Sequence, residues 1–282
     1  MNIQEYCREK LEKTYKELSN LQIAEILPSL VEKTKYHFQK IEEDKHSRGI
    51  EPEYELVEYP SDTLLRHDFL RRENGLSYIR KHREEILKAI CKMNWRSFEF
   101  LCEHLLNINN IILSGVAGGT KEGGIDFYGL LEMNRFSAGV LLRDAKIKII
   151  GQAKHYKNVV DHTEVRVFKT HRDDLLQNTG NAIKKKPSWF IESKGPLLSI
   201  FVVTTKFTRG AKTYAKKNDI ILRDGEQVVE DLIKSTNGRE WFSRKNGALA
   251  FDEVLFLQFF RKKGLPTQQS KSLTTTKHPH PD

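Results

Sequence analysis

The sequence has few of the residues that build disulfide-rich, zinc-binding or membrane-spanning proteins. Its 282 residues include only three cysteines, Cys7, Cys91 and Cys102, and none belongs to a Cys-x-x-Cys pair. A disulfide framework or zinc module is therefore not expected. Cys91 and Cys102 fall in apolar helical patterns and are predicted to be core residues. The longest apolar runs, such as 201–203, are far too short to cross a bilayer. The first ten residues lack the apolar stretch of a signal peptide, so we expect a cytoplasmic protein with no membrane partner.

A nucleoside-triphosphate site is not expected either, although the middle of the chain is rich in glycine. Glycines at positions 115, 118, 119, 123 and 124 predict a loop after a short strand at 111–113. A P-loop would need a Gly-Lys-Ser/Thr sequence beside these glycines, and none follows them. The glycine-rich segment therefore needs another explanation.

Positive charge is concentrated in one part of the chain. The net charge of +9 divides into −2 for residues 1–90 and +11 for residues 91–282. A basic region beside a nearly neutral one indicates a polyanionic partner such as nucleic acid. Charge alone leaves open the alternative of a basic surface that is merely solvated.

The first 90 residues have the spacing of helices. Apolar residues recur at intervals of three and four within 21–43, as in Ile23, Ile26, Leu27, Leu30 and Val31. This predicts a helix over 21–43, after a first helix over 3–18. Pro52 and Pro60 indicate a loop or edge strand at 51–60, and helices are expected again at about 62–73 and 76–92. We therefore predict a helical N-terminal domain, residues 1–90, with a role in recognition, dimerisation or regulation.

The rest of the chain alternates between helix-like and strand-like patterns. Asn94 and Thr208 are suitable N-caps for two helices. The continuous apolar run from Leu197 to Thr205 is typical of a strand buried on both faces. Other segments extend this pattern: an inserted strand within 133–144, a helix over 161–177, a strand over 220–222, and helices over 226–234 and 251–262. The tail from Lys263 is predicted to be disordered, which leaves its His278-x-His280 pair without structured neighbours.

Two apolar runs carry the residues with the clearest chemistry. One run, 125–131, has Asp126 near its start, and the other, 147–151, leads into Gln152-Ala153-Lys154. Because side chains alternate along a strand, Gln152 and Lys154 point to one face and Ala153 to the other. If the runs are neighbouring strands, a carboxylate, an amide oxygen and an ammonium group meet at one place. Such a set could hold a hard divalent cation and orient a water beside a phosphate.

The same residues resemble a known nuclease family. Three pieces, Gly118-Gly119, Gly123-Gly124-Ile125-Asp126 and Gln152-Ala153-Lys154-His155-Tyr156-Lys157, are similar to the core of the Mrr-like restriction endonucleases of the PD-(D/E)xK nuclease superfamily. Phe98-Glu99-Phe100-Leu101 resembles the first helix of that family, and 201–225 resembles its closing strand, helix and strand. The resemblance covers roughly residues 92 to 236. Two positions depart from the family pattern: Glu122 stands where Asp is common, and Ala153 where Cys is usual.

The resemblance implies a fold and an activity. The fold would be a restriction-endonuclease-like mixed sheet flanked by helices over 91–240, with a C-terminal helical extension over 241–263 and a disordered tail over 264–282. The activity would be Mg²⁺-dependent hydrolysis of DNA phosphodiester bonds, with Mn²⁺ able to substitute, in restriction or antiviral defence. Asp126 and Gln152 would bind the metal, Glu99 would be a further catalytic ligand, and Lys154 would position the attacking water. The glycine-rich loop would let the DNA backbone approach the metal.

Partners and alternatives follow from the same reasoning. Cations near the expected site are candidates for contacts with DNA phosphates: Lys157, Lys206, Arg209 and Lys212. The run 184–186 is either a solvated loop or a phosphate-binding segment. Double-strand cutting generally needs two active sites, so we expect a homodimer, with a defence-system partner protein as a further option. Two other functions stay open: a DNA-binding effector subunit regulated through residues 1–90, and a structure-specific or RNA-cleaving nuclease with the same site.

Overall fold

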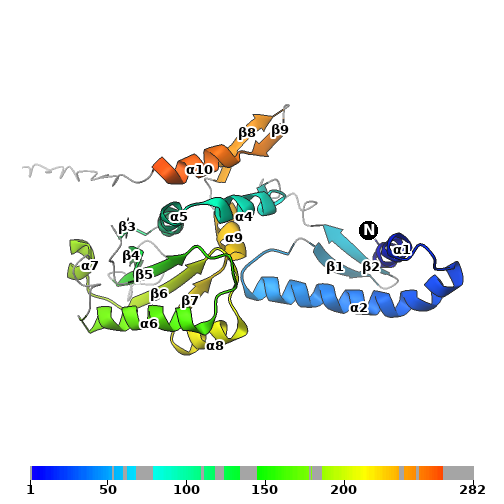
Figure 1. The fold of residues 1–282 in the computed structure, drawn as a ribbon, viewed down its shortest axis with the longest axis horizontal. Helices are drawn as coiled ribbons and strands as arrows, with labels where there is room; N and C mark the ends of the chain where they lie inside the picture. The colour runs from blue at the N-terminus through cyan, green and yellow to red at the C-terminus, as the bar shows by residue number, and fades with distance from the viewer. Residues whose placement is uncertain are drawn as a thin grey trace, which may run out of the picture.

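A five-stranded mixed sheet forms the centre of the molecule, and a smaller module extends from it at the N-terminal end (Figure 1). The computed structural model describes residues 2–52, 54–59, 62–67, 79–108, 111–117, 124–133, 145–177, 179, 186–234, 238–245 and 248–262. The strands of the central sheet are β3 (Leu113–Val116), β4 (Phe127–Glu132), β5 (Lys146–Lys154), β6 (Leu197–Val203) and β7 (Ile220–Arg223). They lie in this order across the sheet. The pairs β3–β4 and β4–β5 are antiparallel, whereas β5–β6 and β6–β7 are parallel.

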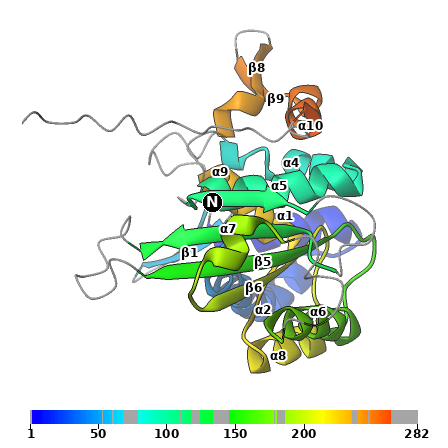
Figure 2. The ribbon, with the colours of Figure 1, turned by 90° about the vertical axis from the view of Figure 1, so that its left-hand side faces the viewer.

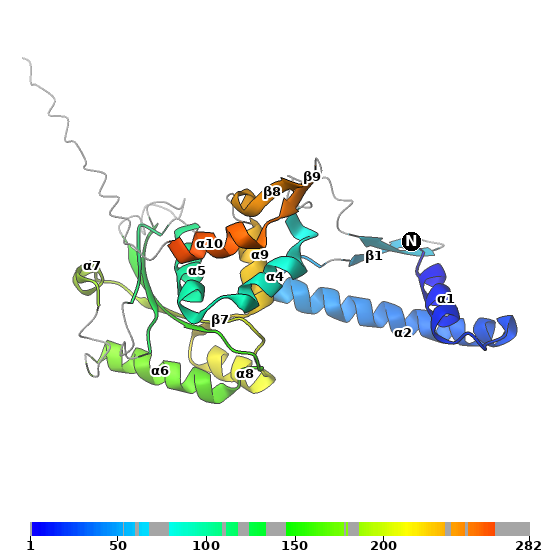
Figure 3. The same cartoon turned by 45° about the horizontal axis from the view of Figure 1, so that its top comes forward.

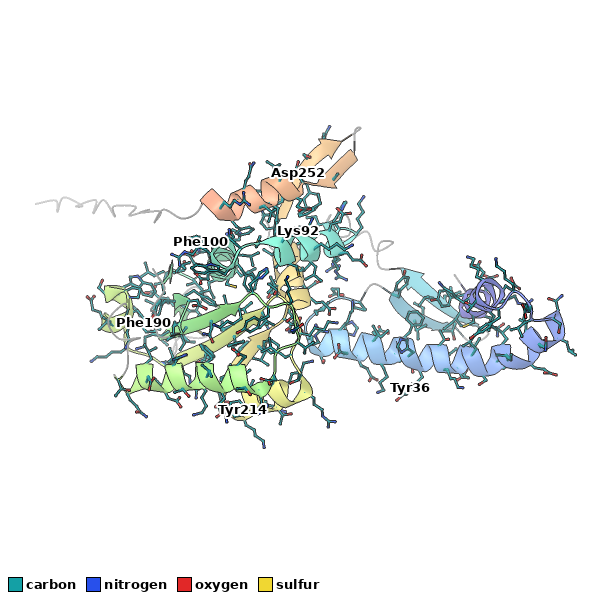
Figure 4. All side chains as sticks on the ribbon, viewed as in Figure 1. Tyr36, Lys92, Phe100, Phe190, Tyr214 and Asp252 are labelled. Atoms are coloured by element: carbon teal, nitrogen blue, oxygen red, sulfur yellow. The ribbon has the colours of Figure 1, made fainter. Side chains whose placement is uncertain are left out.

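Helices cover both faces of this sheet (Figure 2). One face packs against a layer that contains α4 (Arg83–Lys92), α5 (Trp95–Ile108), α9 (Gly225–Lys234) and α10 (Glu253–Lys262). The other face packs against α6 (His162–Leu176) and α8 (Arg209–Lys217). The short helix α7 (Ser188–Glu192) places Phe190 against Tyr128 of β4, with 5.0 Å between the ring centroids (Figure 4). The predicted α/β fold, a mixed sheet flanked by helices, is confirmed.

Side-chain alternation assigns the strand residues to the two layers. Ile149 packs on the α5 side of the sheet and Ile150 on the α6 side. On β6, Phe201 and Val202 alternate in the same way. Gly151 is required because a Cβ at this position would lie 1.8 Å from the Cζ atom of Phe127 on the neighbouring strand. The ring of Phe127 therefore fills the place where β5 has no side chain.

Local capping residues begin several helices where the sequence predicts them. The side chain of Asn94 accepts a hydrogen bond from the backbone N–H of Ser97 at 2.8 Å. Thr208 accepts one from the N–H of Ala211 at 3.1 Å. Asp161 caps α6 by accepting from the N–H of Thr163 at 2.8 Å. These bonds satisfy donors that the first turn of a helix leaves free.

The N-terminal module consists of α1 (Ile3–Thr14), α2 (Asn20–Ser47) and an antiparallel hairpin of β1 (Tyr54–Tyr59) and β2 (Asp62–His67). The predicted helix over 62–73 is therefore wrong, because its first six residues form β2 and residues 68–73 lie outside the described part. Thr63 and Leu65 are both buried, and this two-residue period belongs to a strand. Tyr59 pairs with Asp62 at the end of the hairpin.

Other expectations were also inaccurate or lie on residues that are not described. Cys102 is buried as predicted, but Cys91 is exposed, because the buried stripe of α4 runs through Ile86, Ala89 and Ile90. The strand expected at 111–113 begins at Leu113, and a hairpin of β8 (Phe242–Lys245) and β9 (Ala248–Phe251) precedes α10 without having been predicted. The inserted strand within 133–144, apart from Met133, and the tail from Lys263 lie outside the described residues.

Arg48, just beyond the end of α2, connects the N-terminal module to the sheet unit. Its Nη2 atom donates to Asp224 Oδ2 at 2.7 Å and to Glu226 Oε2 at 2.9 Å, and its Nη1 atom donates to Asp44 at 2.9 Å. The carbonyl of Arg48 accepts a further bond from Gln227 at 3.0 Å. Figures 1 and 3 both show α2 running from α1 to the side of the sheet unit at this contact. The side chain of Asp224 is only 3% exposed, so its charge depends on Arg48 for compensation.

Replacing Arg48 by alanine is expected to lower the free energy of unfolding by about 3 kcal/mol, because it leaves a buried carboxylate without its partner. Chemical denaturation of the whole chain measures this change. Lys40→Ala is the control, since Lys40 forms an exposed ion pair with Glu43, a type that contributes about 0–1 kcal/mol. Equal effects of the two substitutions would contradict the role assigned to Arg48.

Candidate active site

Asp126 lies where β4 begins, between β3 and β5. Its backbone N–H donates to the carbonyl of Gly151, and its own carbonyl accepts from Ala117, both at 2.8 Å. Its side-chain Oδ2 atom accepts a hydrogen bond from the backbone N–H of Ala153, also at 2.8 Å. The predicted neighbouring strands are therefore confirmed as β4 and β5, and the carboxylate of Asp126 is held against the segment 152–154.

The environment of Asp126 is both buried and positively charged. Burial raises the pKa of its carboxyl group above the ordinary value. The N–H of Ala153 and the positive charges of Lys154, His171 and Arg96 counteract part of this rise. Lys154 thus lies within electrostatic reach of Asp126, as the alternation pattern predicted. A buried carboxylate whose charge is only partly compensated is well suited to accept a cation.

Gln152 contributes a buried acceptor. The residue is 2% exposed, and its Oε1 atom is buried and has no hydrogen-bond partner in the described part of the chain. A buried polar atom in this state carries a desolvation cost of about 1–3 kcal/mol. Amide oxygens are ordinary ligands of Mg²⁺ and Ca²⁺, so a bound cation would satisfy this oxygen. The residues present therefore fit a divalent metal ion held by Asp126 and Gln152.

Glu99 lies at the edge of this site on α5 and is 5% exposed. Its Oε2 atom accepts a hydrogen bond from Nη1 of Arg96 at 2.9 Å. The pKa of the Cys102 thiol is raised by burial and further by the charges of Asp126 and Glu99, which places both carboxylates near one thiol. Within the described residues, no three His, Cys, Asp or Glu side chains are grouped closely enough to hold a metal ion. Glu99 as a metal ligand stays a prediction. Glu103, four residues further along α5, accepts a hydrogen bond from the hydroxyl of Ser114 at 2.8 Å.

Sequence reasoning missed two side chains near Asp126, namely Arg96 and His171. Arg96 is in the first turn of α5, three residues before Glu99. His171 comes from α6, and a Cβ on Gly124 would lie 2.0 Å from its Cδ2 atom. Gly124 also has a φ of 74°, a conformation that favours glycine. Burial is the largest influence on His171 and lowers its pKa. No pattern in the sequence pairs position 171 with position 124.

The candidate DNA-binding cations lie near the carboxyl ends of β5 and β6, which share one edge of the sheet because these strands are parallel. Val160 donates to the carbonyl of Lys206 at 2.8 Å, so the segments that follow the two strands run side by side. Lys157, Lys206, Arg209 and Lys212 are all exposed. Lys206 forms an ion pair with Glu226 at 3.1 Å. Lys154 lies at the same edge, but contact of these four cations with DNA stays a prediction. Lys184 and Lys185 lie outside the described residues, as do 118–123 of the glycine-rich loop.

Comparison with known proteins yields one family. The family model Mrr_cat, described as a restriction endonuclease, matches residues 90–184, which include Glu99, Asp126, Gln152 and Lys154. No curated protein matches the chain. The similarity to solved structures is distant. MspJI restriction endonuclease in complex with a 27-mer oligonucleotide is 13% identical, with a TM-score of 0.39 over 72% of this chain. The DNA modification-dependent restriction endonuclease AspBHI is 14% identical, with a TM-score of 0.38 over 64% of this chain.

The chain spans only 38% and 39% of the lengths of those two proteins, and both structural likenesses are weak. The family match is narrower than the resemblance in the sequence, because it ends at residue 184, before β6. It nevertheless includes β4, β5 and all four predicted catalytic residues. Residues 90–184 are thus the part of the chain that matches the restriction endonuclease family model.

Proposed function

We propose that this protein is a metal-dependent endonuclease that hydrolyses DNA phosphodiester bonds, with Mg²⁺ as the usual ion and Mn²⁺ able to replace it. The observation that carries the proposal is the arrangement at the junction of β4 and β5. The buried carboxylate of Asp126 lies there beside Lys154, and the amide oxygen of Gln152 has no hydrogen-bond partner among the described residues. Carboxylate and amide oxygens suit a hard cation, and the family match supports the reaction class.

The roles of the residues follow from their chemistry. When bound, the metal ion would lower the pKa of a coordinated water and offset charge on the phosphate. Asp126 and Gln152 would hold the ion, and the N–H of Ala153 would fix the orientation of the Asp126 carboxylate. Lys154 would orient the attacking water and favour its hydroxide form through its positive charge. Lys157, Lys206, Arg209 and Lys212 would contact DNA phosphates near this edge of the sheet.

The biological setting is also part of the proposal. Restriction or another form of defence against foreign DNA in the cytoplasm fits a nuclease domain of this family. No helix in the described residues is both long and apolar enough to cross a membrane. A homodimer would supply two active sites for cutting both strands of a duplex.

Cleavage of plasmid DNA tests this function directly. Purified protein is incubated with methylated and unmethylated plasmid in Mg²⁺, in Mn²⁺, or in EDTA. We expect cleavage in either metal and complete loss of cleavage in EDTA, because Asp126 and Gln152 alone cannot activate water. A difference between the two plasmids would indicate dependence on base modification. Cleavage that persists in EDTA would contradict the metal-dependent mechanism.

A second candidate is favoured by the Arg48 contact, which joins the N-terminal module to the turn before α9. Such a contact could transmit the binding of an activator to the nuclease domain. In that case, the protein would be a regulated effector whose isolated form does not cut. Absence of cleavage by the wild-type chain, together with cleavage by Arg48→Ala, would support this candidate over a nuclease that is always active.

A further inference from the structure

Arg96 connects three parts of the candidate site. Its Nη1 atom donates to Glu99 Oε2 and to the carbonyl of Ala117, both at 2.9 Å. Ala117 is the last described residue before the glycine-rich loop. The charge of Arg96 also acts on the carboxyl group of Asp126. The guanidinium group is therefore beside the residues proposed to hold the metal and at the base of the glycine-rich loop.

Most of the hydrogen-bonding capacity of Arg96 is not used within the described part of the chain. Both of its bonds there come from the single atom Nη1, although a guanidinium group has five N–H donors. The side chain is 34% exposed. Within the described residues, its Nε and Nη2 atoms form no hydrogen bond, so these donors can bind a ligand.

Aromatic side chains flank this guanidinium group. It lies 5.9 Å from the ring centroid of Trp95 and 5.2 Å from that of Phe100, which is marked on α5 in Figure 4. Trp95 itself is 56% exposed. Cation–π contacts of this kind hold a guanidinium group in place without using its N–H donors. The free donors are therefore presented in a defined orientation.

A phosphate group is the ligand that fits these features. Arginine binds phosphate oxygens through two parallel N–H···O bonds, and the proposed reaction brings a phosphodiester to Asp126. A phosphate bound to Arg96 would share the guanidinium group with the carboxylate of Glu99. Binding of DNA would therefore weaken the Arg96–Glu99 pair.

We propose that Arg96 is a phosphate-binding residue of the active site and that the DNA phosphate competes with Glu99 for its guanidinium group. The inference rests on the proposed function, because it takes DNA as the substrate. It adds a contact with the substrate to the roles already assigned to Asp126, Gln152 and Lys154. It also predicts that the pair between Arg96 and Glu99 is weaker when DNA is bound than when it is absent.

Binding of a fluorescent DNA duplex, measured by anisotropy in EDTA so that no cleavage occurs, tests the first part. Arg96→Ala is expected to weaken binding about tenfold, the loss of one charge-assisted hydrogen-bonded contact. The slope of log K against log salt should also become shallower by about 0.9, the value for one phosphate contact. Arg96→Lys should recover the salt slope and only part of the affinity. Arg8→Ala, a change at an exposed position of α1, is the control and should leave both unchanged.

Glu99→Gln tests the competition. We expect this change to tighten DNA binding several-fold in the protein with Arg96 and to have no such effect combined with Arg96→Ala. The double variant removes both members of the Arg96–Glu99 pair. If the only role of Arg96 is to pair with Glu99, this variant will bind DNA like the wild type. That result, or an unchanged salt slope in Arg96→Ala, would overturn the inference but not the proposed function. Failure of the wild-type protein to bind DNA at all would overturn the proposed function and the inference with it.

Discussion

Replacing Lys154 by alanine is expected to reduce the rate of DNA cleavage about 10³-fold, within the range observed when a group that assists proton transfer is removed. The ammonium group of Lys154 lies at the end of β5, within electrostatic reach of Asp126. In the proposed reaction it orients the attacking water and stabilises the hydroxide. The substitution removes this charge while Asp126 and Gln152 stay in place. Single-turnover cleavage at saturating protein measures the effect on the chemical step.

The same strand offers a matched control for this experiment. Lys146 is at the other end of β5, where it forms a partly exposed ion pair with Glu132 at 3.3 Å. Lys146→Ala should cleave at the wild-type rate, and both variants should keep the wild-type circular dichroism spectrum. Cleavage by Lys154→Ala at a rate near that of the control would remove Lys154 from the mechanism.

Replacing Asp126 by asparagine is expected to abolish metal-dependent cleavage and, without metal, to raise the melting temperature at neutral pH. The loss of activity follows because asparagine removes the carboxylate that is hydrogen-bonded to the segment 152–154 and proposed to hold the metal. The gain in stability follows because burial raises the pKa of Asp126, so its charged form is costly in the folded protein. An asparagine oxygen can still accept the bond from Ala153. Metal binding by calorimetry and thermal unfolding in EDTA measure the two effects.

The stability difference between Asp126→Asn and the wild type should depend on pH with a definite sign. A raised pKa in the folded state means that Asp126 contributes stability below its unfolded pKa of about 3.9. This contribution is lost as pH rises through the folded-state pKa. The two proteins should therefore melt at similar temperatures in acid, and the advantage of the variant should grow toward neutral pH and then level off.

Asp161 provides a control of opposite sign. Its pKa is lowered, chiefly by the hydrogen bond from the backbone N–H of Thr163. Its charged form therefore stabilises the folded protein above the unfolded pKa, and this contribution is lost as pH falls. Asp161→Asn should accordingly melt slightly below the wild type at neutral pH. If Asp126→Asn showed the same sign as Asp161→Asn in EDTA, the assignment of Asp126 as a buried, costly carboxylate would be wrong.

Short-range patterns in the sequence predicted much of the sheet unit. Alternation along 147–154 predicted that Gln152 and Lys154 share a face, and the pairing of Phe127 with Gly151 brings this segment beside Asp126. The caps at Asn94 and Thr208 were predictable because an N-cap bond joins residues only two or three positions apart. Pattern reasoning failed for the predicted helix over 62–73. The part of it that forms β2, Asp62–His67, is only six residues long, and a pattern this short does not distinguish a strand from a helix.

The sequence by itself determined which residue types are available at the candidate site: one carboxylate, one amide and one ammonium group at fixed positions on two strands. Only the tertiary structure decided that the oxygen of Gln152 is buried with no partner among the residues the structure describes, that Glu99 is paired with Arg96, and that His171 lies against Gly124. It also decided that Arg48 meets Asp224, 176 positions away. The physical reason is range. Alternation and capping depend on neighbours along the chain, whereas burial, ion pairing and pKa depend on which distant elements pack together.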